Sequence, residues 1–142
     1  MGVRLFAEEM REEFLRRQDL DPQLKQALKG LTFRLIMLSL DAPGNQDRQM
    51  AMNLQGGRFI SIMYDIQPAP SELRTMPFDS KRFDARGTAP HDVFFDLVTG
   101  KKDLISSFPL IKIEGNIGKL MGQIEGFVGL INFISKMDIQ PG

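Results

Sequence analysis

The chain has 142 residues, the length of one domain, so residues 1–142 are expected to form a single unit with a core of its own. Its 18 basic and 18 acidic residues cancel, which argues against a nucleic-acid partner, because such proteins need an excess of positive charge. Cysteine is absent, which excludes disulfide bonds, thiol nucleophiles and thiolate-bound metals, and fits a reducing compartment.

Two helices are expected at the N-terminal end, where the sequence is rich in charge and lacks the apolar segment of a signal peptide. An amphipathic helix over residues 3–18 is predicted by apolar side chains at helical spacing, namely Val3, Phe6, Met10 and Phe14. Asp21 followed by Pro22 is typical of a helix N-terminus, and Gly30 is expected to end this second, short helix. No run of about 18 apolar residues follows, so we expect a cytoplasmic chain that does not span a membrane.

Three strands are expected next. Residues 32–40 are apolar on both faces, as in a central strand. Residues 48–55 alternate, and the inward positions are Met50, Met52 and Leu54. A hairpin turn at Gly56 and Gly57 leads into residues 58–66, whose expected inward face carries Ile60, Ile62, Tyr64 and Ile66.

The second half combines a loop, two further strands and three helices. Residues 67–81 contain three prolines and are expected to form a long loop or lid. A short strand over 82–88 precedes a helix from Pro90 to Val98, and one or two helical turns follow over 103–108. A strand over 110–114, with Ile111 and Ile113 inward, leads into a long helix over 116–134. This order predicts an α+β domain with an antiparallel meander and helices on one face.

Residues with catalytic or metal-binding chemistry are scarce. His91 is the single histidine, expected at the surface or in a helix cap, and its neighbour Asp92 points elsewhere on the helix. The chain has no serine-hydrolase elbow, phosphate-binding loop, dinucleotide fingerprint or calcium-binding loop. We therefore predict no catalytic residue, no metal site and no cofactor.

The glycines of the last helix are more informative. Gly118, Gly122 and Gly126 recur every four residues, and each glycine inside a helix costs about 1 kcal/mol relative to alanine. Together they form a groove that admits either a close-packed backbone or a molecule from outside the chain. The nine methionines favour an interior with irregular or variable contents, because their side chains are flexible. The apolar surplus of this region therefore favours a lipid-sized cavity.

Two stretches resemble a known family. Residues 89–101 read Ala-Pro-His-Asp-Val-Phe-Phe-Asp-Leu-Val-Thr-Gly-Lys, and residues 112–120 read Lys-Ile-Glu-Gly-Asn-Ile-Gly-Lys-Leu. They are similar to the C-terminal half of sterol carrier protein 2 domains, which share a Thr/Ser-Gly-Lys helix end and a Lys-Ile-Glu-Gly-Asp strand-to-helix junction. The Asp-Pro-Gln-Leu helix and the strand over 31–40 resemble the family's opening more loosely. The resemblance covers nearly the whole chain, and its specific motifs lie within residues 89–120.

This resemblance implies a five-stranded mixed, mostly antiparallel sheet covered on one face by helices, with an apolar tunnel between the layers. It also implies a non-enzymatic carrier of fatty acids, acyl-CoA, sterols or phospholipids. Asn116 stands where the family usually has Asp, which leaves helix capping available. The 67–81 segment is longer than usual and could reshape the tunnel mouth, and the sequence leaves open whether it gates the tunnel. The ending Gln-Pro-Gly lacks a peroxisomal signal, so a prokaryotic, cytoplasmic carrier is expected.

The leading hypothesis is an intracellular carrier that buries one elongated apolar ligand and contacts membranes transiently. The polar groups available to a ligand's head group are Gln123, Asn116 and Lys119. The expected lipid contacts are Phe94, Val98, Leu104, Ile105, Phe108, Ile113, Ile117, Leu120, Met121, Gly122, Ile124, Gly126, Phe127, Val128 and Ile131.

Two other readings stay open at this point. In the first, the cavity is vestigial and the glycine face of the last helix packs against a second copy in a homodimer. In the second, the protein is an enzyme that uses Glu114 or Asp96 as a base. The enzyme hypothesis is disfavoured, because a lone carboxylate without a partner or an electrophile is not an active site.

Overall fold

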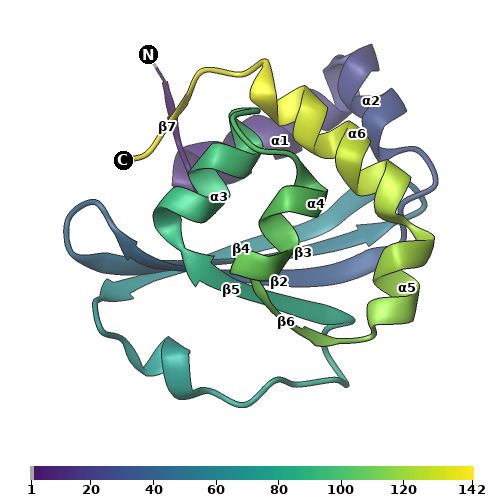
Figure 1. The fold of residues 1–142 in the computed structure, drawn as a ribbon. Coiled ribbons are helices and arrows are strands. Elements are labelled where there is room, and N and C mark those ends of the chain that lie inside the picture. The colour runs from purple at the N-terminus through teal and green to yellow at the C-terminus, as the bar shows by residue number, and fades with distance from the viewer. Residues whose placement is uncertain (1) are drawn as a thin grey trace.

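The computed structural model describes residues 2–142, and its centre is one five-stranded sheet (Figure 1). The strand order is β4-β3-β2-β5-β6; β2 and β5 are parallel, and the other neighbours are antiparallel. The strands are β2 (Phe33–Ala42), β3 (Gln46–Gln55), β4 (Arg58–Pro68), β5 (Ala85–Pro90) and β6 (Lys112–Gly115). The predicted mixed, mostly antiparallel sheet is therefore confirmed.

Six helices lie on one face of this sheet (Figure 1). They are α1 (Glu8–Leu20), α2 (Pro22–Leu28), α3 (His91–Val98), α4 (Leu104–Ser107), α5 (Ile117–Gly122) and α6 (Ile124–Ser135). The core lies between the two layers and is made of side chains from both, among them Phe14, Leu28, Phe33, Met50 and Leu130. The predicted α+β architecture is confirmed. No helix within residues 2–142 is long and apolar enough to cross a membrane.

The N-terminal segment differs from the prediction at its start. Val3–Arg4 forms a short strand, β1, that pairs in parallel with β7 (Ile139–Gln140), so the helix begins at Glu8 and not at Val3. The pairing joins the two ends of the described chain and satisfies backbone groups that local periodicity cannot reveal. Phe6, Met10 and Phe14 are nevertheless buried, as their spacing predicts.

The cap of α2 is confirmed. The carboxylate of Asp21 accepts a hydrogen bond from the backbone N–H of Gln23 at 2.9 Å, and Pro22 is the first helical residue. Gly30 follows the helix with a φ of +81°, a conformation that favours glycine. The sequence was sufficient to predict this helix and its cap, because the residues that form the cap lie within a few positions of one another.

The prediction of which β4 side chains face inward is wrong at one position. A bulge lies between the pairs Asn53–Ser61 and Leu54–Phe59, which leaves Ile60 as the extra residue. The strict alternation therefore fails at this point, and Phe59 and Ile62 are buried while Ile60 is 56% exposed.

The long helix predicted over 116–134 is broken at Gln123. Its side-chain amide accepts a hydrogen bond from the backbone N–H of Thr32 and donates one to the carbonyl oxygen of Thr32, both at 2.9 Å. The backbone of Gln123 leaves helical geometry, with φ −118° and ψ 16°, and α6 runs at an angle to α5 (Figure 1). The break is caused by a partner that lies 91 residues away in the sequence.

The segment after β4 crosses the open face of the sheet (Figure 1). It is attached through Asp47 on β3, which is fully buried and accepts hydrogen bonds from the hydroxyl of Ser71 at 2.6 Å and from the guanidinium of Arg74 at 2.8 Å. The hydrogen bonds from Arg74 hold the pKa of Asp47 well below its usual range. Leu73 adds a buried apolar contact.

A second buried polar group lies where the chain ends meet. Arg48 on β3 is fully buried, and all of its acceptors are neutral oxygen atoms. Its guanidinium donates to Gln46 Oε1 at 2.9 Å and to the carbonyl oxygens of Leu5 at 2.9 Å, Pro141 at 2.9 Å and Pro43 at 3.4 Å. One side chain thus connects β3 to the N-terminal turn, the β2–β3 turn and the C-terminal segment.

His91 belongs to the same cluster, so the expected surface or capping position is wrong. The ring is 4% exposed; its Nε2–H donates to the carbonyl oxygen of Pro141 at 2.7 Å, and Nδ1 accepts from the hydroxyl of Ser39 at 2.7 Å. Burial lowers the pKa of His91 from 6.5, and the nearby Arg48 lowers it further, against the opposing effects of the Pro141 carbonyl and of Asp92.

This burial predicts a loss of stability on mild acidification. The unfolded chain takes up a proton as the pH falls through about 6.5, whereas folded His91 does so only at lower pH. The free energy of unfolding should therefore be highest above that pH and decrease below it, by at most about 1.4 kcal/mol per pH unit. Urea unfolding at pH 7.5 and pH 5.5, with His91→Gln as control, measures this effect. An equal decrease in both proteins would contradict the role of His91.

Candidate functional site

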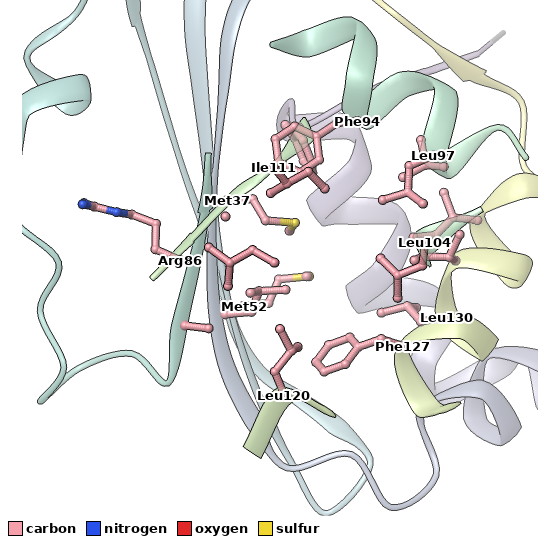
Figure 2. A pocket seen from close by; sticks show the side chains of 18 of the residues that line it. Met37, Met52, Arg86, Phe94, Leu97, Leu104, Ile111, Leu120, Phe127 and Leu130 are labelled. Carbon is pink, nitrogen blue, oxygen red and sulfur yellow. The ribbon is translucent and has the colours of Figure 1, made fainter. Parts of the chain in front are cut away.

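A cavity of about 120 Å³ lies between the sheet and the helices (Figure 2). On the sheet side, Met37 and Met52 point into it, and on the helical side Leu104, Phe127 and Leu130 do so (Figure 2). The cavity therefore lies within the layer that forms the protein's core.

The cavity lining is apolar. Arg86 on β5 is the one charged residue that contributes to it, and its side chain points through the sheet to the opposite face (Figure 2). There its guanidinium donates to Glu114 at 2.9 Å and to the carbonyl oxygen of Met76 at 2.7 Å. The cavity thus offers neither a charge nor a hydrogen-bonding side chain to a ligand.

Small residues on strand β5, which lies between β2 and β6, create this space. Ala85 and Gly87 both face the cavity, where most strand residues would fill the core with a larger side chain. A Cβ atom added to Gly87 would lie 3.3 Å from Ile111 Cγ2, so even alanine would be tight against the wall. The neighbouring strand β2 contributes Leu35 and Met37, which alternate with residues facing the other side.

Nine of the fifteen predicted contact residues line this cavity. They come from all the elements between α3 and α6 and comprise Phe94, Val98, Leu104, Phe108, Ile113, Leu120, Ile124, Phe127 and Ile131. Whether they contact a lipid remains a prediction, but the structure places them around one apolar space.

The other six do not line the cavity. Helical periodicity turns Ile105, Ile117, Met121 and Val128 outward, with exposed fractions of 77%, 45%, 49% and 40%. The two glycines, Gly122 and Gly126, also lie outside the lining.

The glycine face of α6 seats a neighbouring part of the chain, so its interpretation as space for a ligand is wrong for Gly126. A Cβ atom at Gly126 would lie 2.5 Å from Leu31 Cδ2, and one at Gly129 would lie 3.8 Å from the carbonyl oxygen of Ala27 in α2. These glycines let α6 pack closely against α2 and the following turn. Gly122 has no atom within 4 Å of such a Cβ and borders open space away from the cavity.

The two glycines should therefore respond differently to alanine. Gly126→Ala is expected to lower the free energy of unfolding by about 1–3 kcal/mol, because buried Leu31 must move. Gly122→Ala should be neutral or stabilising by up to about 1 kcal/mol, because alanine is the better helix former. Urea unfolding of both variants measures the difference. A destabilised Gly122→Ala with a neutral Gly126→Ala would contradict the packing described here.

Thirteen residues that line the cavity were not among the contacts predicted from the sequence. The members from the first half of the chain and from the sheet are Phe6, Met10, Phe14, Leu35, Met37, Met52, Ala85, Arg86 and Gly87, and Leu97, Ile111, Leu130 and Ile134 complete the set. Periodicity marks many of them as inward-facing, but a pattern of burial does not distinguish a filled core from a cavity wall. Residues 67–81 contribute nothing to the lining and lie on the face of the sheet opposite the helices, so they do not border this cavity.

The polar residues expected near a ligand's head group have structural partners instead. Asn116 caps α5 by accepting from the backbone N–H of Lys119 at 3.0 Å, and Gln123 binds Thr32. Lys119 Nζ lies 3.0 Å from the carboxylate of Asp84. Burial would raise the pKa of Asp84, but hydrogen bonds from Arg34 and Lys119 outweigh it and lower the pKa to about 2. None of the three lines the cavity.

The described residues show no other site of obvious chemistry. Within residues 2–142, no three His, Asp or Glu side chains gather as a metal ion would require. Glu114 pairs with Arg86 at 2.8 Å on the open face of the sheet, and Asp96 does not line the cavity.

These features define an α+β protein whose sheet and helices enclose an apolar cavity. No protein-family profile and no curated protein matches the sequence. Among solved structures, the chain is similar to a crystal structure of sterol carrier protein 2, with a TM-score of 0.70 and 14% identity over 94% of this chain and 98% of the other.

Two further solved structures are similar. One is a conserved hypothetical protein of Thermus thermophilus, described as a possible sterol carrier protein, with a TM-score of 0.69 and 14% identity over 99% of this chain and 94% of the other. The other is sterol carrier protein domain 2 of Helicoverpa armigera, with a TM-score of 0.52 and 16% identity over 92% and 88% of the two chains. The chain therefore has a sterol carrier protein 2-like fold, as its motifs predict.

Proposed function

We propose that this protein is a non-enzymatic carrier that binds one elongated apolar ligand in the cavity between its sheet and helices. The class of ligand comprises fatty acids, acyl-CoA, sterols and phospholipids. The observation that carries the proposal is the apolar cavity itself, whose one charged lining residue, Arg86, directs its side chain away from it. The sterol carrier protein 2-like fold supports the proposal.

An empty cavity of this kind destabilises the protein. At about 24 cal/mol per Å³, a volume of about 120 Å³ corresponds to roughly 3 kcal/mol. A larger residue at Ala85 would recover part of that energy. A ligand recovers it as well, because each buried CH₂ group contributes about 0.8 kcal/mol.

The cavity must widen to hold a long ligand. Its volume is comparable to the engineered cavities of about 150 Å³ that take up benzene, so it holds a short apolar segment as it stands. In the wall, Met10 Sδ accepts a hydrogen bond from the backbone N–H of Phe6 at 3.3 Å and is therefore held in place. Met37 and Met52 have flexible side chains that can change rotamer without leaving polar groups unpaired. We expect these residues to move when a long chain enters.

Ligand binding should depend on chain length and hardly on the head group. In a fatty-acid series from hexanoate to palmitate, one ligand is expected per chain, and affinity should rise about fourfold per CH₂ group until the cavity is filled. Dodecanol should bind about as well as dodecanoate, because the cavity offers the carboxylate no partner. Titration calorimetry measures both series. Affinity independent of chain length would contradict burial of the chain in the cavity.

Native mass spectrometry of the purified protein distinguishes this proposal from the homodimer hypothesis. A monomer that carries lipid supports the carrier, and an empty dimer supports an interaction module. Gly126 packs against Leu31, whereas Gly122 borders open space and Gly118 meets only the side chain of Asn116, so the chain itself fills only part of the glycine face. The sterol carrier protein 2-like fold supports the carrier as the better reading. Its cytoplasmic location and prokaryotic origin stay predictions.

A further inference from the structure

A second concave space lies on the open face of the sheet, which faces away from the helices (Figure 1). It is a groove of about 630 Å³ between the strands and the segment that follows β4. A smaller recess of about 250 Å³ continues the groove, and the two share the lining residues Ala51, Met63, Arg82 and Phe83. Of the described residues, Met52 and Arg86 alone line both this space and the interior cavity. The groove is therefore a separate site on the other side of the sheet.

The strand register sorts the floor of this groove into a polar row and an apolar row. Arg34 on β2 pairs with Asn53 on β3, and Asn53 pairs with Ser61 on β4, so these three side chains form one row across the sheet. The next row on the same face, two residues further along each strand, consists of Ile36, Ala51 and Met63. The two rows are about 7 Å apart. The floor thus places hydrogen-bond donors directly beside an apolar surface.

The polar end of the groove is rich in donors and carries a positive charge that no acid balances. The polar side chains that line the recess are Arg34, Asn53, Ser61 and Arg82, and no Asp or Glu of the described residues joins them. Arg34 is paired with Asp84 at 3.1 Å, but the guanidinium of Arg82 has no ion pair or hydrogen bond within residues 2–142. It lies 5.2 Å from the centre of the Phe83 ring. An anion is the complementary ligand for this end.

The wall opposite the strands is aromatic and fixed in place. Phe78 and Phe83 line the groove from the segment after β4, together with Met76. Arg86 donates a hydrogen bond to the carbonyl oxygen of Met76 at 2.7 Å. Phe78 packs against the backbone of β6, where a Cβ atom added to Gly115 would lie 2.8 Å from Phe78 Cζ. The groove is therefore formed before any ligand enters it.

The apolar floor is short. In the row beyond it, Gln49 on β3 pairs with Asp65 on β4, and both residues line the groove. This carboxylate lies about 7 Å beyond the apolar row and about 14 Å from the polar row. The space between the two polar rows fits one or two rings, whereas an extended acyl chain would run into Asp65.

We propose that this groove binds a small aromatic carboxylate, with the carboxylate group at Arg82 and the ring over Ala51 and Met63. A guanidinium group binds a carboxylate through two parallel hydrogen bonds, and the polar row adds further donors. Methionine sulfur makes favourable contacts with aromatic rings, and Met63 and Met76 both line the groove while 58% and 53% exposed. The site is independent of the proposed carrier function, because it uses the opposite face of the sheet.

Binding of 2-naphthoate tests the proposal. Its fluorescence anisotropy can be followed without interference from tryptophan, which the chain lacks. One naphthoate is expected per chain. Arg82→Gln, which removes the charge, and Ala51→Leu, which fills the floor, should each weaken binding about tenfold. Arg16→Gln, on the exposed surface of α1, is the matched control and should bind like the unaltered protein.

Ala85→Leu separates the groove from the interior cavity. It narrows the cavity and leaves the groove untouched, so naphthoate affinity should stay the same. Loss of naphthoate binding in Ala85→Leu but not in Ala51→Leu would place the compound in the cavity and overturn the proposal. Equal weakening by Arg82→Gln and Arg16→Gln would overturn it in favour of non-specific charge attraction, and an absence of binding would also refute it. If naphthoate binds as expected but fatty acids do not, the proposed function fails and the groove stands.

Discussion

Arg48→Ala is expected to lower the free energy of unfolding by about 3–5 kcal/mol, one of the largest effects of any single substitution in this chain. Arg48 is fully buried, and truncating it leaves a cavity in place of a long side chain. The carbonyl oxygens of Leu5 and Pro43 also lose their donor, and that of Pro141 keeps only the Nε2–H of His91. A buried acceptor without a partner costs about 1–3 kcal/mol, so the loss of polar partners adds to the loss of packing.

Urea unfolding of the purified variant measures this effect, and Arg16→Ala is its control. The side chain of Arg16 is 57% exposed and pairs with Glu13 on the surface, so its removal should change stability by no more than about 0.5 kcal/mol. Arg48→Lys should be intermediate, because an ammonium group cannot reach all four acceptors at once. Equal stability of the Arg48 and Arg16 alanine variants would contradict the role of Arg48 as the connection between the chain ends.

Arg48 also illustrates what the sequence could and could not predict. The alternation that places Met50, Met52 and Leu54 inward also places Arg48 on the same side of the strand. Its burial is therefore consistent with the pattern, but two of its acceptors, Leu5 and Pro141, lie 43 and 93 residues away and cannot be read from local spacing. The burial of His91 was not predicted for the same reason: its partners Ser39 and Pro141 are 52 and 50 residues away.

Elements whose determinants are local were predicted well. The hairpin at Gly56 and Gly57, the cap at Asp21 and the cap at Asn116 each depend on residues within four positions. The errors arise where tertiary contacts override the local pattern. Gln123 breaks a helix because it binds Thr32, and the bulge at Ile60 changes the face of a strand without any turn residue to signal it.

The candidate site was predicted in part for a related reason. The last three helices are apolar around much of their circumference, so periodicity could not separate inward Leu104 from outward Ile105, or Leu120 from Met121. Glycine spacing indicated a close approach but not its partner, which proves to be Leu31 and α2. The small residues Ala85 and Gly87, which create the space, carry no signal of their own without the sheet around them.

Ala85→Leu is expected to abolish most ligand binding without destabilising the protein. Ala85 faces the cavity from strand β5, and the volume of about 120 Å³ accommodates the three additional carbon atoms. Filling a cavity of this kind typically raises the free energy of unfolding by about 0.5–2 kcal/mol. The same three carbons displace about three CH₂ groups of a ligand, a loss of roughly 2.4 kcal/mol at about 0.8 kcal/mol each, so affinity should fall more than tenfold.

The matched control is Ala51→Leu, the same substitution on the same sheet but on its opposite face. Ala51 on β3 borders Ile36 and Met63 on the side away from the helices, and it does not line the cavity. This variant should keep the ligand affinity of the unaltered protein and change its stability by no more than about 0.5 kcal/mol. Calorimetric titration with dodecanoate and urea unfolding of both variants give the two readouts. If Ala85→Leu were stable and still bound dodecanoate with full affinity, the ligand would have to bind outside this cavity. If both variants lost affinity equally, the loss would come from the sheet as a whole and not from occupation of the space beside Ala85.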